Sequence, residues 1–303
     1  MPVPRLRPGQ ALVRVGASAV CGSERSALRQ GFAGNAGHEA GGTIVEPGAS
    51  HFRPGDLVGL SAVVGCDVCD RCREGRELHC RSGPTIATGW HCEYLAVAPS
   101  ALRTLPVGVD AAMAAMLTGD PLGVPVRALR RAPTGKGDRV VVIGLGPVGL
   151  AHVVVRAFEG ADVVGVEPAR FRRNLGLELG ASQVFHAVDD IGFKADVVIE
   201  CTGIPECIRQ AFAIVEDGGV VLQSGECVAE IPLSPTEIFV RREVTYTGSW
   251  YYASEDYGAM VDLMGKGLPL ERLCTHDVGA SQAQEAITEF LNGRTGKVVL
   301  RWS

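Results

Sequence analysis

Short hydrophobic runs, broken by glycine- and proline-rich turns, fill the first hundred residues. Strand-like runs cover residues 11–20, 41–48, 56–64 and 93–99. Turn sequences such as Arg-Pro-Gly-Asp at 53–56 separate these runs, and clusters of this kind are typical of the ends of strands. The pattern predicts a small, irregular, mainly β domain.

From Arg139 onward, continuous valine and isoleucine runs alternate with helical stretches. Strands are expected over 139–144, 161–167, 195–203 and 218–225, and helices over 147–160, 169–180 and 208–216. Strands of a parallel sheet are buried on both faces, so they read as unbroken apolar runs. The pattern therefore predicts a parallel sheet covered by helices on both faces.

The pattern changes again after about Tyr246. Helices are expected over 254–267 and 281–293, followed by a final short strand over 297–302. This last strand could extend the parallel sheet.

Length and charge limit the classes of protein to consider. A chain of 303 residues, 46% hydrophobic and 21% charged, has enough core for two domains. Its net charge of −5 argues against a nucleic-acid partner, because phosphate binding needs a clustered positive surface. The first ten residues lack the apolar core of a secretory signal, and no run approaches the roughly 20 apolar residues of a membrane span. We therefore expect a cytoplasmic protein with no membrane partner.

Four of the ten cysteines fall close together in a polar loop, with the spacing C-x2-C-x2-C-x7-C: Cys66, Cys69, Cys72 and Cys80. In a reducing compartment a tight cluster favours metal binding over disulfides. An iron–sulfur cluster is one alternative, but seven residues rather than three precede the fourth cysteine and no proline follows it. Buried packing cysteines are a second alternative. Four thiolates at about 2.3 Å would close a zinc ion off from water, so the spacing predicts a structural zinc.

A second group of possible metal ligands lies upstream. Cys21 follows the first expected strand, and His38 and Glu39 stand in the sequence Gly-His-Glu. A thiolate, an imidazole and a carboxylate form a set that suits zinc. Each residue alone is more often a packing or turn residue, and the order of the motifs along the chain is what favours a metal site.

A glycine-rich loop joins the first strand of the expected parallel sheet to its helix. Gly144, Gly146 and Gly149 follow the pattern G-x-G-x-x-G, with Pro147 and Val148 between the last two. Such glycines allow a tight turn and place a pyrophosphate over the start of the helix. The loop predicts a dinucleotide site.

An acidic residue favours NAD as the dinucleotide. Glu167 lies 18 residues after Gly149, at the end of the next expected strand. A carboxylate there can accept hydrogen bonds from ribose hydroxyls and repels a 2′-phosphate. The alternative is a solvated glutamate at a strand end. Arg170, Arg172 and Arg173 complicate the interpretation, because arginines can hold a 2′-phosphate.

With these motifs in this order, the chain resembles the zinc-dependent medium-chain alcohol dehydrogenase family over nearly all its length. Gly-Asp-Pro-Leu-Gly-Val at 119–124 is similar to the Glu/Asp-Pro stretch of the polyol (sorbitol) and threonine dehydrogenase branches. The resemblance implies two zinc ions per chain, one structural and one catalytic. Cys21 and His38 would hold the catalytic zinc, with Asp120 as ligand or as partner of zinc-bound water. Glu39 would bind the ion directly or support it. Asp120 alone would otherwise be a helix N-cap.

The resemblance also implies a fold and a reaction. The fold class is α/β, with an irregular β-rich GroES-like catalytic domain over 1–120 and a C-terminal return over 248–303. A Rossmann domain with a doubly wound parallel sheet would bind NAD over 121–247, and Arg172 matches a position that contacts the adenosine half. The reaction would be hydride transfer between NAD and a secondary alcohol such as a polyol, cyclitol, sugar or amino alcohol, in a homodimer or homotetramer.

Several residues near the expected catalytic zinc acquire roles by the same resemblance. Ser23 occupies a Ser/Thr position whose hydroxyl binds the alcohol and relays its proton. Glu24 replaces the usual aspartate and is expected to hold the ring of His38, unless it is a solvated turn residue. Ser26 lies near the position of a histidine that passes the proton to solvent. His91 could contact a polar substrate or be a core histidine.

Two other classes of protein remain to be weighed. A dinucleotide-binding protein without catalysis, acting as a redox sensor or structural protein, would keep the glycine loop. Cys21, Ser23 and His38 together argue against it, because such a protein needs no open zinc site. A zinc-ribbon module that binds nucleic acid is disfavoured by the acidic net charge.

Overall fold

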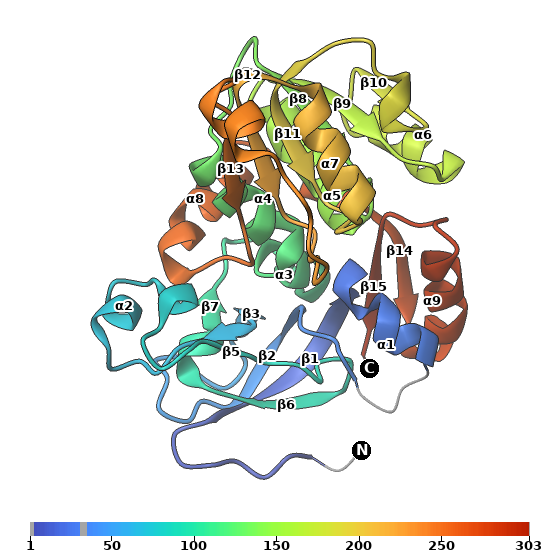
Figure 1. Cartoon of the computed structure of the whole chain (residues 1–303). Helices are drawn as coiled ribbons and strands as arrows, with labels where there is room; N and C mark the ends of the chain where they lie inside the picture. The colour runs from blue at the N-terminus through green and yellow to red at the C-terminus, as the bar shows by residue number, and fades with distance from the viewer. Residues whose placement is uncertain (1–2, 31–34, 303) are drawn as a thin grey trace. The chain divides into compact units, whose positions relative to one another are not determined.

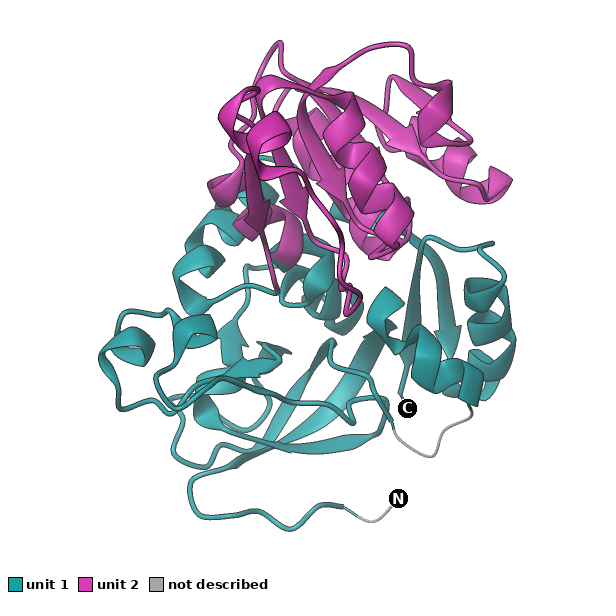
Figure 2. Ribbon diagram, in the orientation of Figure 1, with its two compact units in different colours: residues 1–123, 251–303 teal, residues 124–250 magenta. Residues whose placement is uncertain are grey.

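The structure is a computed structural model that describes residues 3–30 and 35–302 (Figure 1). The chain divides into two compact units, residues 1–123 with 251–303 and residues 124–250 (Figure 2). Among the described residues, no helix combines the length and the apolar character that a membrane crossing would require.

The first unit is built on a seven-stranded, largely antiparallel sheet. Its strand order is β14-β15-β1-β2-β3-β7, and β6 pairs with β1 at the other end of that long strand. The strands of the unit, including a separate two-stranded ribbon of β4 and β5, are β1 (Ala11–Val20), β2 (Ala40–Glu46), β3 (Leu57–Leu60), β4 (Val63–Val64), β5 (Thr85–Ile86), β6 (Tyr94–Val97), β7 (Leu102–Thr104), β14 (Cys274–Gly279) and β15 (Lys297–Arg301). Its helices are α1 (Arg25–Gln30), α2 (Asp70–Arg73), α3 (Ala111–Leu117), α8 (Ser254–Gly265) and α9 (Ala283–Leu291).

Helix α3 packs unusually close to this sheet because glycines line the strands beneath it. A Cβ at Gly16 would lie 2.7 Å from the Cβ of Ala111, and side chains at Gly41 and Gly59 would overlap the same helix or Thr118 just after it. Asp110 begins the helix, since its side chain accepts the N–H of Met113 at 2.8 Å. These contacts hold α3 close against the strands.

The second unit is a six-stranded sheet in which every registered pair is parallel, with the order β10-β9-β8-β11-β12-β13. Its strands are β8 (Arg139–Ile143), β9 (Asp162–Val166), β10 (Gln183–Phe185), β11 (Ala195–Glu200), β12 (Val215–Gln223) and β13 (Thr245–Gly248). Its helices are α5 (Pro147–Phe158), α6 (Arg170–Glu178), α7 (Pro205–Ile214) and most of α4 (Asp120–Arg131). Buried valines and isoleucines of β8, β9 and β11 form its core, so the parallel α/β sheet expected from the sequence is confirmed.

Three expectations about elements need correction. Residues 56–64 form two short strands, β3 and β4, instead of one. Val215 and Glu216 begin β12 and do not end the preceding helix, because Val215 pairs with Ala195 in the sheet. The final strand does not extend the parallel sheet. Instead β15 pairs antiparallel with β1 in the first unit, with Val20 opposite Val298.

Candidate active site

Four buried side chains of the first unit converge at one point. They are Cys21, His38, Glu39 and Asp120, and one donor atom of each lies within 4.8 Å of the others. Asp120 Oδ2 is 3.1 Å from both Cys21 Sγ and His38 Nε2. The sequence analysis named all four as candidate ligands of one ion, and the fold brings all four together.

The pairing of β1 with β2 explains how three of them meet. Ser18 lies opposite Ala40 in this antiparallel pair, and Ala19 N donates to Glu39 O at 3.0 Å. Cys21 follows the end of β1, and His38 and Glu39 precede the start of β2. The two strand ends are therefore neighbours, although Cys21 and His38 are 17 positions apart in the sequence.

Asp120 reaches the same point from the helical layer. It is the first residue of α4, three residues after α3 ends. Gly119 allows close contact here, because a Cβ at that position would lie 2.9 Å from Glu39 Cγ. The glycine-lined packing of α3 on the sheet thus sets the place of the Asp120 carboxylate.

The charges in this cluster depend on one another. Burial lowers the pKa of His38, but the hydrogen bond and charge of Asp120 outweigh burial and raise it overall. Burial, followed by the charges of Asp120 and Glu39, raises the pKa of the Cys21 thiol. Burial also raises the pKa of Glu39, to about 7, although Lys297 opposes the shift. The cluster brings several acidic groups together, and a cation shared among them would stabilise their charged forms.

Lys297 supplies a cation at the edge of the cluster. Its side chain is 1% exposed, and Nζ lies 2.5 Å from Glu39 Oε2. Lys297 begins β15, so the pairing of that strand with β1 places the ammonium group. A buried charge is stable only when it is paired. The ion pair with Glu39 provides that partner, and the sequence analysis did not predict it.

The donor set fits zinc. Thiolate, imidazole and carboxylate are the three ligand types that zinc binds in proteins, and their donor atoms are close enough to share one ion. Asp120 contacts both Cys21 and His38, whereas Glu39 pairs with Lys297. Three protein ligands with a fourth nearby would suit a site that keeps one position for a substrate.

The expected partner of Glu24 is wrong. Glu24 was expected to hold the ring of His38, but its Oε2 lies 2.8 Å from His91 Nε2. The Nδ1 atom of His38 instead lies 3.0 Å from Ala36 O. His91 is buried in the core, and its Nδ1 lies 2.7 Å from Ser18 Oγ.

The two serines of this region lie in different settings. Ser23 is exposed in the 3-10 turn η1 (Gly22–Glu24), two residues after Cys21. Ser26 lies in α1, where its Oγ accepts a hydrogen bond from Gln30 Nε2 at 3.2 Å. Ser26 therefore makes a hydrogen bond within its own helix, whereas Ser23 is exposed.

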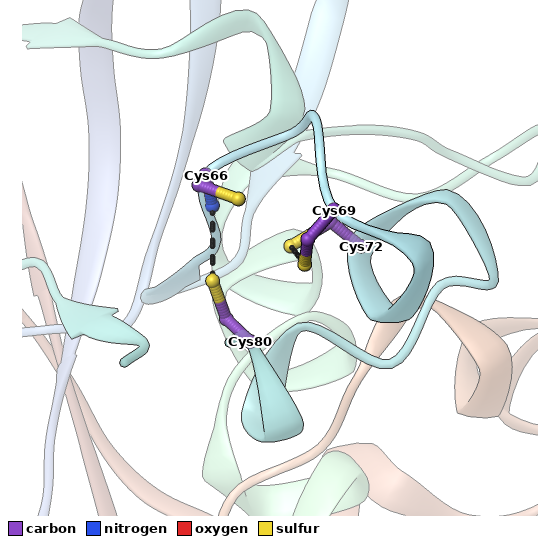
Figure 3. Close-up of side chains that lie close together, drawn as sticks. All are labelled: Cys66, Cys69, Cys72 and Cys80. Carbon is purple, nitrogen blue, oxygen red and sulfur yellow. Dashed lines mark hydrogen bonds between the residues drawn. The ribbon is translucent and has the colours of Figure 1, made fainter. Parts of the chain in front are cut away.

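The four cysteines of the polar loop form the second cluster. One sulfur of each of Cys66, Cys69, Cys72 and Cys80 lies within 4.8 Å of the others, and Figure 3 shows their side chains pointing toward one another. Cys69 directly precedes α2, Cys72 lies within α2, and Cys80 follows the 3-10 turn η2 (Glu77–His79). Four sulfurs at this separation fit a tetrahedral, closed zinc site.

Backbone amides favour the charged form of some of these thiols. Hydrogen bonds from the N–H groups of Val68 and Cys69 lower the pKa of Cys66 to about 6. The N–H groups of Arg81 and Cys72 lower that of Cys69. Amides that point at sulfur stabilise thiolates, which are the form that binds metal.

Two backbone contacts tie this cysteine lobe, residues 66–80, to the start of α8. Glu255 N donates to Gly75 O at 2.9 Å, and Ser254 N donates to Glu77 Oε2 at 2.9 Å. Asp70 and Arg81 add two hydrogen bonds of 2.6 Å within the loop. The lobe is therefore hydrogen-bonded to a helix that lies more than 170 positions further along the chain.

The glycine loop of the second unit has the geometry expected of a phosphate-binding turn. Gly144 has φ +87°, and a Cβ there would overlap Thr202. A Cβ at Gly149 would overlap the carbonyl oxygen of Gly144, while one at Gly146 would meet open space. Gly146 caps α5, and Pro147 is its first residue. These features leave backbone N–H groups at the helix start open to an anion.

Glu167 is buried and braces this loop. Its Oε2 accepts the Leu145 N–H and its Oε1 accepts the Ala169 N–H, both at 2.9 Å. Each carboxylate oxygen has two lone pairs, so both could still accept from a ribose. Arg173 donates to Glu167 O at 3.0 Å, and Arg172 is buried in α6. The carboxylate is therefore an organiser of the loop, a role that the sequence analysis did not assign.

A second buried carboxylate, Glu200, was missed by the sequence analysis. It ends β11 and accepts hydrogen bonds from the N–H groups of Thr202 and Gly203 at 2.7 and 3.0 Å and from Gln223 Nε2 at 2.7 Å. It joins the turns that follow β11 and β12. The sequence did contain a sign of this role, because Glu200 is an acidic residue at the end of an otherwise largely apolar strand.

Comparison with known proteins agrees with this arrangement. Residues 7–107 match the alcohol dehydrogenase GroES-like domain, and residues 147–266 match the zinc-binding dehydrogenase domain. A probable D-xylulose reductase A of Aspergillus clavatus and a sorbitol dehydrogenase of Gallus gallus are each 28% identical to this chain, over 99% of it and 91% of the relative.

Solved structures show the same fold. The alcohol dehydrogenase TADH from Thermus sp. ATN1 matches with a TM-score of 0.87 and 26% identity, over 99% of this chain and 95% of that one. The 2R,3R-butanediol dehydrogenase from Bacillus subtilis matches with a TM-score of 0.85 and 23% identity, over 100% and 95%. The expected α/β class with a GroES-like and a Rossmann-type part is confirmed, and the chain belongs to the zinc-dependent medium-chain alcohol dehydrogenase family.

Proposed function

We propose that the protein is a zinc- and NAD-dependent dehydrogenase that interconverts a secondary alcohol of a polar substrate and its ketone. The observation that carries the proposal is the buried convergence of Cys21, His38, Glu39 and Asp120 in a member of this family. A protein that only bound a dinucleotide would have no use for an open metal site beside a separate closed one.

In the proposed site, Cys21, His38 and Asp120 hold the ion, because Asp120 Oδ2 contacts both other donors. Zinc bound there supplies Lewis acidity that makes the alcohol easier to deprotonate. Carboxylates donate less electron density than thiolates, so a site with one thiolate and one carboxylate remains strongly acidic.

Glu39 is proposed as the alternating fourth donor. Its ion pair with Lys297 holds it within the cluster, and movement of the carboxylate between the ammonium group and the ion would open or close one position. Ser23 is exposed in the η1 turn, two residues after Cys21, and its hydroxyl is proposed to bind the alcohol oxygen and to pass its proton toward solvent.

NAD is the proposed cofactor, bound at the loop that contains Gly144, Gly146, Pro147, Val148 and Gly149. Glu167 supports this choice, because a buried carboxylate beside the loop disfavours a 2′-phosphate. Glu167→Ser should reduce the preference for NAD over NADP by about tenfold, the equivalent of about 1.4 kcal/mol. The measurement is kcat/KM with each cofactor, and a wild-type enzyme that already prefers NADP would contradict the assignment.

Arg172 is proposed to contact the adenosine half of the cofactor. It is buried in α6, the helix that follows β9 and Glu167 along the chain. The arginine side chains at 170 and 173 flank it, and Arg173 is hydrogen-bonded to backbone carbonyls.

The substrate class is proposed from the relatives. The named ones include a D-xylulose reductase, a sorbitol dehydrogenase and a butanediol dehydrogenase, all of which are named for polyols, diols or their ketones. A polyol, cyclitol, sugar or amino alcohol is therefore proposed for this chain.

The assembly and location are further proposals. A homodimer or homotetramer is supported by β13, an edge strand of the parallel sheet, whose Tyr246 and neighbouring Trp250 are each about two-fifths exposed. A cytoplasmic location is supported by ten free cysteines. We propose residues 1–120 with 248–303 as the catalytic domain and 121–247 as the NAD domain.

The test is a screen of the purified protein with NAD against polyols, cyclitols, sugars and amino alcohols, with NADH formation as the readout. A secondary alcohol should be oxidised at a rate that depends on added zinc after chelation. Binding of NAD with no turnover of any of these alcohols or reduction of their ketones would contradict the proposal and favour a redox sensor.

A further inference from the structure

A chain of hydrogen bonds runs through the first unit to the backbone of Cys21. Trp302 Nε1 donates to Ser18 Oγ at 2.9 Å, and Ser18 Oγ lies 2.7 Å from His91 Nδ1. His91 Nε2 lies 2.8 Å from Glu24 Oε2, and Glu24 Oε1 accepts the Cys21 N–H at 2.8 Å. Ser18, Glu24, His91 and Cys21 are all buried. The network thus connects β1, the η1 turn, the loop before β6 and the end of β15.

The chemistry of its members fixes the direction of three of these four bonds. An ionised carboxylate only accepts, so His91 carries a proton on Nε2. The indole N–H of Trp302 only donates, so Ser18 Oγ accepts it, and the same hydroxyl is hydrogen-bonded to His91 Nδ1. Burial alone would raise the pKa of Glu24, but the hydrogen bonds from His91 and from the Cys21 N–H hold it below its usual value.

The ring of His91 also lies against the backbone beside the second expected ligand. A Cβ at Gly37, the residue before His38, would lie 2.7 Å from His91 Cδ2. The backbone of His91 is fixed in turn, because Asn35 Nδ2 donates to His91 O at 2.9 Å and His91 N donates to Asn35 Oδ1 at 3.2 Å. One side chain therefore acts on the backbone next to both Cys21 and His38.

We propose that His91 is a positioning residue of the metal site, which holds Cys21 through Glu24 and supports the backbone before His38 by direct contact. The inference rests on the proposed function, because it takes Cys21 and His38 as zinc ligands. Buried, fully satisfied networks are rigid, and loss of the groups that orient metal ligands typically lowers metal affinity 10- to 100-fold.

The test follows the metal itself, with cobalt(II) as the probe. Brief treatment of the whole protein with a chelator removes metal from an open site first, because a closed four-thiolate site offers the chelator no position. Cobalt is then added, and elemental analysis verifies one zinc and one cobalt per chain. The absorption bands of thiolate-bound cobalt report the geometry at Cys21, and their decay in excess chelator gives the release rate.

In His91→Phe, which keeps a ring but loses both hydrogen bonds, the bands should shift and cobalt should leave at least about tenfold faster. His91→Gln keeps an N–H that can reach Glu24 and should restore most of the retention. The matched control is His152→Phe. His152 is a fully buried histidine of the other unit with one long contact, 3.4 Å to Ser224 Oγ, and its change should leave the bands unaltered.

Unchanged bands and release in both His91 variants would overturn the inference. If His91→Phe does not fold, Ser18→Ala takes its place, because it keeps the His91 ring and its bond to Glu24 and removes the hydroxyl that contacts Nδ1 and accepts from Trp302. A smaller acceleration is expected, and no change would contradict the proposal. A wild-type protein that takes up no cobalt outside the cysteine lobe would instead contradict the proposed function.

Discussion

The two metal-ligand clusters of the first unit are assembled in different ways. The lobe takes four ligands of one kind from residues 66–80, and three of them are partly exposed. The other cluster takes a thiolate, an imidazole and two carboxylates from residues 21, 38, 39 and 120, all buried. The first depends on one loop, whereas the second depends on the pairing of β1 with β2 and the packing of α3.

This difference indicates that the two clusters have different roles, one in stability and one in catalysis. Ligands from a single loop can close around an ion without the rest of the unit, so such a site stabilises the loop. Ligands from three elements are held at positions that the whole unit determines, so they can keep an ion open on one side. Damage to the lobe should therefore reduce stability, and damage to the buried cluster should reduce catalysis.

The largest expected effect is on catalysis. Cys21→Ser should lose one zinc per chain and lower kcat by about a thousandfold, since Lewis-acid stabilisation is worth several kcal/mol. The thermal unfolding midpoint should change little, because the lobe and the core of the sheet are untouched. Zinc content, kcat and thermal unfolding are measured on the same preparation. Full activity with only the lobe zinc present would contradict the catalytic role of the buried cluster.

The reverse effect is expected in the lobe. Cys72→Ser should weaken the lobe zinc and lower the unfolding free energy by about 2 kcal/mol or more, since structural zinc binding contributes directly to folding. The unfolding midpoint should fall by several degrees, while kcat of the folded fraction stays within about threefold of wild type. A thousandfold loss of kcat with unchanged stability would reverse the roles of the two clusters.

A smaller difference in rate is expected between variants of the two carboxylates, Asp120 and Glu39. Asp120→Ala should lower the hydride-transfer rate by about 10- to 100-fold and leave NAD affinity nearly unchanged, because the glycine loop belongs to the other unit. Glu39→Ala is the matched comparison, with a smaller loss expected because Glu39 is held by Lys297. Single-turnover rates with deuterated alcohol and NAD titrations give the two quantities. A larger loss in Glu39→Ala would make Glu39 the main acid ligand.

The sequence predicted the two clusters to different degrees. The spacing of the lobe cysteines is a local signal, so the residues alone pointed to a zinc site. Cys21, His38 and Glu39 needed the order of the motifs, and Asp120 needed the family resemblance. The parallel sheet followed from its apolar runs, because burial on both faces leaves no alternation.

The residues that support the buried cluster could not be predicted in this way. Lys297 reaches Glu39 only because β15 pairs with β1, a contact between residues more than 250 positions apart. The same pairing brings Trp302 to Ser18. The role of Glu24 was inferred from the family resemblance alone, and its partner is His91 instead of the expected His38. Such contacts depend on tertiary packing, and no local pattern encodes them.

The most direct test of the central claim is a time course of chelation on the wild-type enzyme, with zinc per chain and alcohol oxidation measured in the same samples. The open, buried site should release its ion first, so activity should fall in proportion to the first zinc lost while the second remains and the fold is retained. Added zinc should restore activity. Activity that persists after the first zinc has gone, and disappears only with the second, would contradict the account.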